Sequence, residues 1–191
     1  MTRGSKAWRA GIALMAGLMM AGAALAQGAP PPDDTAPVPA AATAPDCKPG
    51  FGCVTRLPLP RFVSLKTDAG NARRGPGLSH RIDWVFLRAG MPLRITAEYE
   101  HWRRVEDAEG VGGWMHYSQL SGARSVQVTG AEAEFRTRPD AAAPVRFKAE
   151  PGVIGRVLEC GGGWCQVQAG DQRGWVQDLA LWGVAPGETI D

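Results

Sequence analysis

The sequence predicts an all-β protein in which two tandem copies of one small module follow an N-terminal leader. Three observations predict this fold class: a repeated pattern of Gly and Trp, short segments of β-forming residues between turns, and no sustained helical periodicity beyond the leader. Each copy has about 60 residues, a length that favours a small barrel over a sandwich.

The repeat is defined by landmarks at matched spacings. One spacing is 12 residues in both copies and another is six; the pairs are Gly90–Trp102 and Gly152–Trp164 for the first, and Trp114–Leu120 and Trp175–Leu181 for the second. Shifts of single residues separate the other landmarks and fall where loops are expected. The two copies therefore span residues 61–122 and 126–183.

Short strands and turns make up each copy. Residues 93–97, Leu-Arg-Ile-Thr-Ala, alternate apolar and polar side chains as a half-buried strand does. Residues 75–77, Gly-Pro-Gly, and 138–140, Arg-Pro-Asp, have the composition of tight turns.

The N-terminus has the pattern of a secretory signal peptide. Three basic residues lie within the first nine positions, residues 10–26 carry no charge, and residues 24–26 read Ala-Leu-Ala. We expect cleavage after residue 26, no stable membrane anchor after cleavage, and a periplasmic or secreted protein. Residues 27–60 are rich in Pro and Ala, and we expect them to form a disordered linker.

The charge balance argues against nucleic-acid binding. The chain has 21 basic and 19 acidic residues, but Arg3, Lys6 and Arg9 belong to the predicted leader. The remaining chain has 18 basic and 19 acidic residues, a net charge of −1, and no long basic run.

All four cysteines follow the predicted leader. An even number in an oxidising compartment suggests disulfides, and three pairings are possible. We favour Cys47–Cys53 and Cys160–Cys165, the second closing a hairpin across a four-residue loop. The repeat places Glu98 and Arg103 at the positions of Cys160 and Cys165, so the first copy is expected to close its hairpin with an ion pair.

Three segments resemble the bacterial SH3 (SH3b) domain: residues 71–77 (Asn-Ala-Arg-Arg-Gly-Pro-Gly), 102–105 (Trp-Arg-Arg-Val) and 113–116 (Gly-Trp-Met-His). Residues 61–66 are similar to the subgroup found in exported proteins of alphaproteobacteria. The second copy departs from the pattern, with Phe135 in place of Ala72. The resemblance implies two SH3-like five-stranded barrels and a role in binding cell-wall material or peptides.

The resemblance also implies a ligand groove lined by Trp102, with Tyr99, His101, Arg104 and Tyr117 nearby. The alternative is that the Trp residues are packing residues, which we favour for Trp114 and Trp175. Trp164 follows three glycines. We therefore expect binding mainly in the first copy.

Two other features have structural interpretations. Arg73 and Arg136 precede the proline turns, and we expect them to donate to loop carbonyls. Residues 57–61, Leu-Pro-Leu-Pro-Arg, could occupy a barrel groove as a built-in ligand, but we favour a plain approach to the first strand.

The sequence shows no catalytic triad, metal-binding spacing or phosphate loop, so we expect neither an enzyme nor a cofactor. The favoured function is a non-catalytic exported module that binds peptidoglycan peptide or an extended protein segment. The alternative is a structural adaptor of the cell envelope with protein partners only.

Overall fold

The computed structural model describes residues 47–191, so the predicted signal peptide and the linker up to residue 46 lie outside it. The described residues fall within one compact unit of the chain. Their regular structure is β throughout, apart from two short 3-10 turns, Tyr117–Gln119 and Asp178–Ala180. In these residues no helix is long and apolar enough to cross a membrane.

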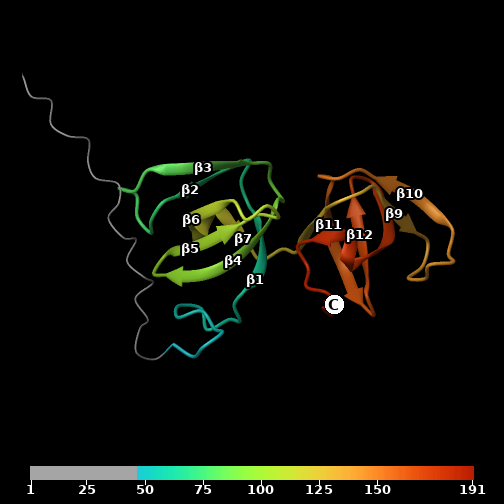
Figure 1. Ribbon diagram of the computed structural model, residues 1–191, viewed down its shortest axis with the longest axis horizontal. Coiled ribbons are helices and arrows are strands. Elements are labelled where there is room, and N and C mark those ends of the chain that lie inside the picture. Colours follow the sequence, from blue (N-terminus) through green and yellow to red (C-terminus); the bar gives the residue numbers. More distant parts are fainter. Residues whose placement is uncertain (1–46) are drawn as a thin grey trace, which may run out of the picture. The chain divides into compact units, whose positions relative to one another are not determined.

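The first repeat folds into one strongly bent sheet, here called the first barrel (Figure 1). Its strands are β1 (Arg61–Leu65), β2 (Ala69–Arg73), β3 (Ile82–Leu87), β4 (Pro92–Tyr99), β5 (Trp102–Glu106), β6 (Gly112–His116) and β7 (Leu120–Ser121). They are arranged in the order β3-β2-β6-β5-β4-β1-β7.

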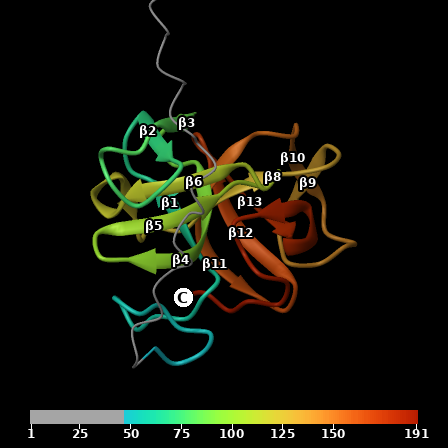
Figure 2. The ribbon, with the colours of Figure 1, turned by 60° about the vertical axis from the view of Figure 1, so that its left-hand side comes forward.

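The second repeat forms the second barrel (Figure 2). Its strands are β8 (Ser125–Val128), β9 (Ala133–Arg136), β10 (Val145–Ala149), β11 (Ile154–Gly161), β12 (Trp164–Ala169), β13 (Gln172–Gln177) and β14 (Leu181–Trp182). The order β10-β9-β13-β12-β11-β8-β14 matches the first sheet position by position, which confirms the tandem repeat. Each sheet has seven strands, whereas five were expected. One of the seven is a strand of only two residues, β7 in the first sheet and β14 in the second.

The two cores place their large aromatic residue on different strands. In the first barrel Ala72 on β2 is covered and Phe86 on β3 fills the core. In the second barrel Phe135 on β9 is the buried aromatic and Ala149 on β10 is the small residue. The cross-strand pairs Gly70–Phe86 and Ala133–Ala149 are equivalent in the two registers. The departure of Phe135 from the repeat is therefore matched by a second, opposite change.

Residues 47–60 correct the prediction of a linker that is disordered up to residue 60. Cys47 and Cys53 form a disulfide, Phe51 bridges to Pro58, and the Leu59 N–H donates to the Gly50 carbonyl at 2.8 Å. Leu59 packs against the first core. These residues, here called the N-terminal loop, are ordered because the disulfide and a buried carboxylate hold them.

That carboxylate is Glu98 of β4, whose side chain is 0% exposed. Its oxygens accept hydrogen bonds from the backbone N–H groups of Val54 and Thr55, at 3.0 and 2.9 Å, and from the Thr55 hydroxyl at 2.7 Å. Arg61 donates to it at 2.6 Å, and Arg103 lies 3.5 Å away. The predicted Glu98–Arg103 cross-strand pair is confirmed, and it also anchors the N-terminal loop.

The equivalent hairpin of the second barrel contains the Cys160–Cys165 disulfide, so both predicted disulfides are confirmed. Cys160 pairs directly with Cys165, and Gly161 pairs with Trp164. The loop is therefore two residues long, not four. Gly162 and Gly163 have φ values of 61° and 82°, the left-handed conformation that a tight two-residue hairpin turn requires at both positions.

The outer edge strands of the two barrels differ in chemistry. On β3 the side chains of Ile82, Trp84, Val85 and Leu87 are exposed. On β10 the equivalent edge carries Arg146 and Lys148, and Lys148 pairs with Glu132 at 2.9 Å. Charged residues at an edge discourage pairing with another chain, so the β10 edge, with two cations, is better guarded than the β3 edge, whose single charge is Asp83.

Candidate functional site

The candidate site of the first barrel is an aromatic surface at one end of β5 and β6. The β4–β5 hairpin presents His101 and Trp102, while β6 ends at His116 and leads into the 3-10 turn that begins at Tyr117. Trp102 pairs with His116 across the sheet, and the Tyr117 N–H donates to the His101 carbonyl at 2.9 Å. Backbone pairing thus brings two separate segments together.

The four side chains form a continuous ring cluster. The Trp102 and His116 rings meet edge-on with centroids 5.5 Å apart, and the His116 and Tyr117 centroids are 4.9 Å apart. The His101 ring lies 5.8 Å from Tyr117 and 6.0 Å from His116. His116 Nδ1 is also 2.8 Å from the Ser118 hydroxyl. We call His101, Trp102, His116 and Tyr117 the aromatic cluster.

The side chains of the aromatic cluster differ in their exposure to solvent. Trp102 is only 8% exposed, whereas Tyr117 is 50% exposed and His101 is open to solvent. Trp102 is nevertheless absent from the central core, to which Val105 of the same strand belongs. Trp102 therefore forms the buried side of the aromatic cluster, and the phenol and imidazole rings form its accessible side.

The other predicted binding residues lie beside this cluster. Tyr99 pairs with Trp102 across the hairpin and is half-buried. Arg104 is exposed on β5, opposite Trp114 of β6, and belongs to none of the ring contacts. His116 was not among the binding residues predicted from the sequence. Its place opposite Trp102 follows from the β5–β6 hairpin register, which the turn around Gly110 could have indicated.

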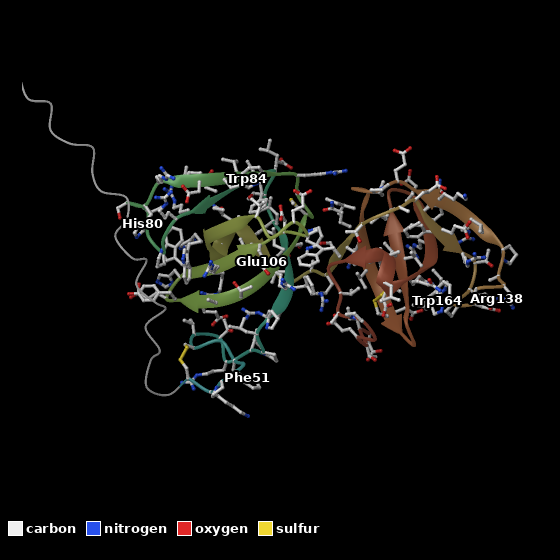
Figure 3. The ribbon with its side chains drawn as sticks, in the orientation of Figure 1. Phe51, His80, Trp84, Glu106, Arg138 and Trp164 are labelled. Atoms are coloured by element: carbon white, nitrogen blue, oxygen red, sulfur yellow. A yellow bond between two sulfur atoms is a disulfide. The ribbon has the colours of Figure 1, made fainter. Side chains whose placement is uncertain are left out.

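The second barrel has a different surface at the equivalent place. Trp164 lies on the second barrel (Figure 3) and is half-buried. It lines a cavity of about 240 Å³ together with Glu132, Glu134 and Arg136. Gln177 and Asp178 occupy the positions of His116 and Tyr117. Asp178 is buried and accepts a hydrogen bond from the Gly187 N–H at 2.7 Å. The aromatic cluster therefore belongs to the first repeat alone.

Several residues singled out in the sequence have structural positions. Arg73 donates to the carbonyls of Leu78 and His80, and Arg136 donates to the Ala143 carbonyl, as predicted. Trp114 is buried as expected, but Trp175 is only half-buried.

The structure also bears on acid chemistry and metal binding. Asp107 is a turn residue, since its Oδ1 accepts the N–H groups of Glu109 and Val111 at 2.9 Å. Across residues 47–191 no group of three or more His, Cys, Asp or Glu side chains is arranged to hold a metal ion.

Glu98 is the carboxylate whose pKa departs most clearly from its ordinary value. Burial raises its pKa, but hydrogen bonds from Thr55 and Arg61 and the charge of Arg103 lower it further, which leaves it at about 2. Because Glu98 is fully enclosed by these partners, it has a structural position and not a catalytic one.

The sequence model described as "Bacterial SH3 domain" matches residues 66–122 and 129–183, which is one match in each barrel. No curated protein sequence matches the chain significantly.

Two solved structures from Trichomonas vaginalis are also similar. NlpC2 is 15% identical, with 64% of this chain and 48% of that chain covered and a TM-score of 0.30. NlpC1 is 13% identical, with 71% and 50% covered and a TM-score of 0.31. The chain thus spans about half the length of each.

Proposed function

Because the chain belongs to the bacterial SH3 domain family, we propose that it is a non-catalytic binding module of the cell envelope. Its ligand is the peptide part of peptidoglycan or an extended protein segment, and the contact surface is the aromatic cluster of the first barrel. Two disulfides in the described chain support a periplasmic or secreted location, because such bonds persist in oxidising compartments.

The exposed face of the aromatic cluster carries this proposal. Tyr117 and His101 offer flat, amphipathic rings with polar edges, and the buried Trp102 holds them in place. Such rings give large contact areas at low entropic cost, and Tyr and Trp are enriched among the residues that dominate binding energy. Tyr99 and Arg104 extend the same surface along β4 and β5.

The experiment is co-sedimentation of the purified protein with peptidoglycan sacculi. Tyr117→Ala should weaken retention about fivefold or more, the equivalent of 1 kcal/mol or more. Tyr117 is the residue to change because it is half exposed, whereas replacing Trp102 would also leave a cavity. Trp84→Ala is the matched control, since Trp84 is 48% exposed on β3 of the same barrel.

The alternative function is an envelope adaptor with protein partners only. The observation that favours it is the largely apolar edge strand β3, which could accept an extended strand from a partner protein. In that case crosslinking in cells traps a defined protein, Trp84→Ala loses the crosslink, and Tyr117→Ala retains it. Absence of wall binding together with loss of the partner in Trp84→Ala would replace the first proposal by this one.

A further inference from the structure

The two disulfides of the described chain differ in their access to solvent. Cys160 and Cys165 are 5% and 1% exposed, so the second barrel covers their bridge. Cys47 and Cys53 are half-buried, and they lie in the N-terminal loop outside the first core. A disulfide is reduced when a thiolate attacks one of its sulfur atoms, so the accessible bridge is the one open to reduction.

Cys53 lies in the middle of the contact between the N-terminal loop and Glu98. The N–H groups of the next two residues, Val54 and Thr55, donate to one carboxylate oxygen of Glu98. On the other side of Cys53, Gly52 packs directly on that carboxylate, where a Cβ atom would lie 2.3 Å from it. The disulfide therefore restrains the segment that shields Glu98 from solvent.

The second oxygen of Glu98 faces Arg103, which holds the β4–β5 hairpin. Arg103 Nε lies 3.5 Å from Glu98 Oε1, and the Arg103 side chain is only 8% exposed. Arg103 Nη1 donates to the carbonyls of Glu100 and Trp102 at 2.9 and 2.8 Å. These two residues flank His101, so one guanidinium group fixes the backbone on both sides of it.

The hairpin turn has one residue in an unfavourable backbone conformation. Glu100 has a φ of 44°, a left-handed conformation that costs energy in a residue with a side chain. The carbonyl of the next residue, His101, accepts the Tyr117 N–H at 2.9 Å and thereby joins the hairpin to the 3-10 turn. The two most exposed rings of the aromatic cluster, those of His101 and Tyr117, are therefore positioned by contacts that lead back to the N-terminal loop.

We propose that the Cys47–Cys53 disulfide is a redox-sensitive clasp that keeps the aromatic cluster ordered. The dithiol of an exported reducing protein opens it by thiol–disulfide exchange. The two thiols of that protein become a disulfide, and their two electrons and two protons leave Cys47 and Cys53 as thiols. The N-terminal loop then separates from Glu98, water reaches the carboxylate, and Arg103 loses its fixed counter-charge.

This inference deepens the proposed function, because it adds a means of regulating the same surface. Its consequence for ligand binding rests on the proposed function. The link from the disulfide to the order of the aromatic cluster does not, and it can be measured on the protein without any ligand.

The test is amide hydrogen exchange of the purified ¹⁵N-labelled protein, followed by NMR before and after reduction with dithiothreitol. Alkylation and mass spectrometry identify the cysteines that have been reduced, and Cys47 and Cys53 should react first. The N–H groups of Val54 and Thr55 should then exchange about tenfold faster or more, because the bridge no longer restrains the loop.

The Tyr117 N–H reports on the aromatic cluster. Its exchange should accelerate about threefold or more on reduction, because its acceptor, the His101 carbonyl, becomes less fixed. The Asp107 N–H is the internal reference, since it follows β5 at the end away from the hairpin and donates to the Val111 carbonyl. Its exchange rate should stay unchanged.

Two double variants separate the clasp from disulfides in general. Replacing both Cys47 and Cys53 by Ala opens the clasp without a reductant and should produce the same accelerations. Replacing both Cys160 and Cys165 by Ala is the matched control. It removes the buried bridge of the second barrel and should leave the exchange rate of Tyr117, relative to Asp107, unchanged.

Arg103→Lys tests the connection between the N-terminal loop and the hairpin. Lysine keeps a positive charge beside Glu98 but lacks the planar group that binds both carbonyls at once. Exchange of the Tyr117 N–H should therefore accelerate in this variant while the disulfide is still closed.

Faster exchange of Val54 and Thr55 on reduction, with Tyr117 unchanged, would overturn the proposal, because the released loop would then not support the aromatic cluster. Unchanged exchange at all three N–H groups after the bridge has opened would overturn it as well. Co-sedimentation distinguishes this failure from a failure of the proposed function. Reduction should lower retention on sacculi about threefold or more, because only molecules with an ordered surface bind. If the oxidised protein is not retained either, peptidoglycan is not the ligand, and the exchange rates still decide the role of the disulfide.

Discussion

Glu98 connects three parts of the first barrel through one buried carboxylate. It joins the N-terminal loop through Val54 and Thr55, strand β1 through Arg61, and strand β5 through Arg103. A buried charge is tolerated only when partners replace the water it has lost, and here each oxygen has several. The N-terminal loop and the barrel therefore depend on the same ionised group.

Glu98→Gln should lower the free energy of unfolding of the first barrel by about 3 kcal/mol, because Arg61 and Arg103 would lose their common counter-charge. Chemical denaturation followed by Trp fluorescence measures the loss. Glu106→Gln is the matched control, since the Glu106–Arg94 pair is partly exposed and should cost less than about 1 kcal/mol. Equal losses in the two variants would contradict the structural role of Glu98.

The low pKa of Glu98 also predicts an acid limit. Its pKa is about 2 in the folded chain against an ordinary value of 4.5, so the unfolded chain takes up the proton first. Its contribution to stability is therefore complete above pH 4.5 and is lost as the pH falls toward 2. As the pH falls through this range, the melting temperature should decrease more steeply in the natural protein than in Glu98→Gln. Parallel pH profiles for the two proteins would refute the assignment.

At the scale of the elements, the two repeats fill their cores with aromatic residues from different strands. The first core is filled by Phe86 of β3, with the small Ala72 on β2, and the second core is filled by Phe135 of β9, with the small Ala149 on β10. Phe135 also stacks on Phe147 with ring centroids 4.5 Å apart. Cores are packed to near-crystalline density, so a gain of volume on one strand requires a loss on its neighbour.

A double-mutant cycle tests this exchange of volume. Phe86→Ala should cost about 3–5 kcal/mol in the free energy of unfolding, because it leaves a cavity in the first core. Ala72→Phe alone should cost about 1–3 kcal/mol through overpacking. The double variant should be more stable than the sum of the two losses predicts. Strict additivity in denaturant unfolding would show that the two sites are independent.

The disulfide of the β11–β12 hairpin should contribute a modest amount to stability. Its cysteines are five positions apart, and closing so short a loop is worth about 2 kcal/mol in the chain-entropy model. Replacing both Cys160 and Cys165 by Ala should lower the free energy of unfolding of the coupled barrels by that amount, as measured by chemical denaturation. A loss several times larger would show that this bridge acts beyond its own hairpin.

The sequence predicted the repeat and the all-β class because Gly and Trp recur at fixed offsets, and it predicted both disulfide pairings because the two cysteines of each pair lie close together along the chain. It also predicted the roles of Arg73 and Arg136, because a guanidinium group before a proline turn has few other partners. The folded state of residues 47–60 was missed, because their ordering depends on Glu98 some 40 positions away. The aromatic cluster was found in part, and His116 entered it only through the strand register.

At the scale of the whole molecule, side-chain contacts connect the two barrels in addition to the peptide that links them. The Arg88 guanidinium donates to the Gly152 carbonyl at 3.1 Å, and the ring of Phe62 meets that of Trp182. Each barrel alone is small, and domains of about 60 residues are marginally stable. Contact between the copies therefore adds burial that neither obtains alone.

Phe62→Ala should uncouple the unfolding of the two barrels by removing the ring that meets Trp182. We expect a single calorimetric transition in the natural protein and two separate transitions in the variant. Val145→Ala is a suitable control, since Val145 is an exposed residue of β10. One unchanged transition in Phe62→Ala would show that the coupling of the barrels does not depend on the Phe62–Trp182 contact.

The contrast between the edge strands β3 and β10 has a consequence for the protein at high concentration. Apolar side chains on an open strand edge favour stacking of identical chains, whereas Arg146 and Lys148 repel them. The first barrel should therefore determine whether the protein associates at high concentration, although both barrels have the same strand order. The turbidity of concentrated solutions should rise in the natural protein, because the β3 edges of different molecules associate. Trp84→Lys should keep such solutions clear.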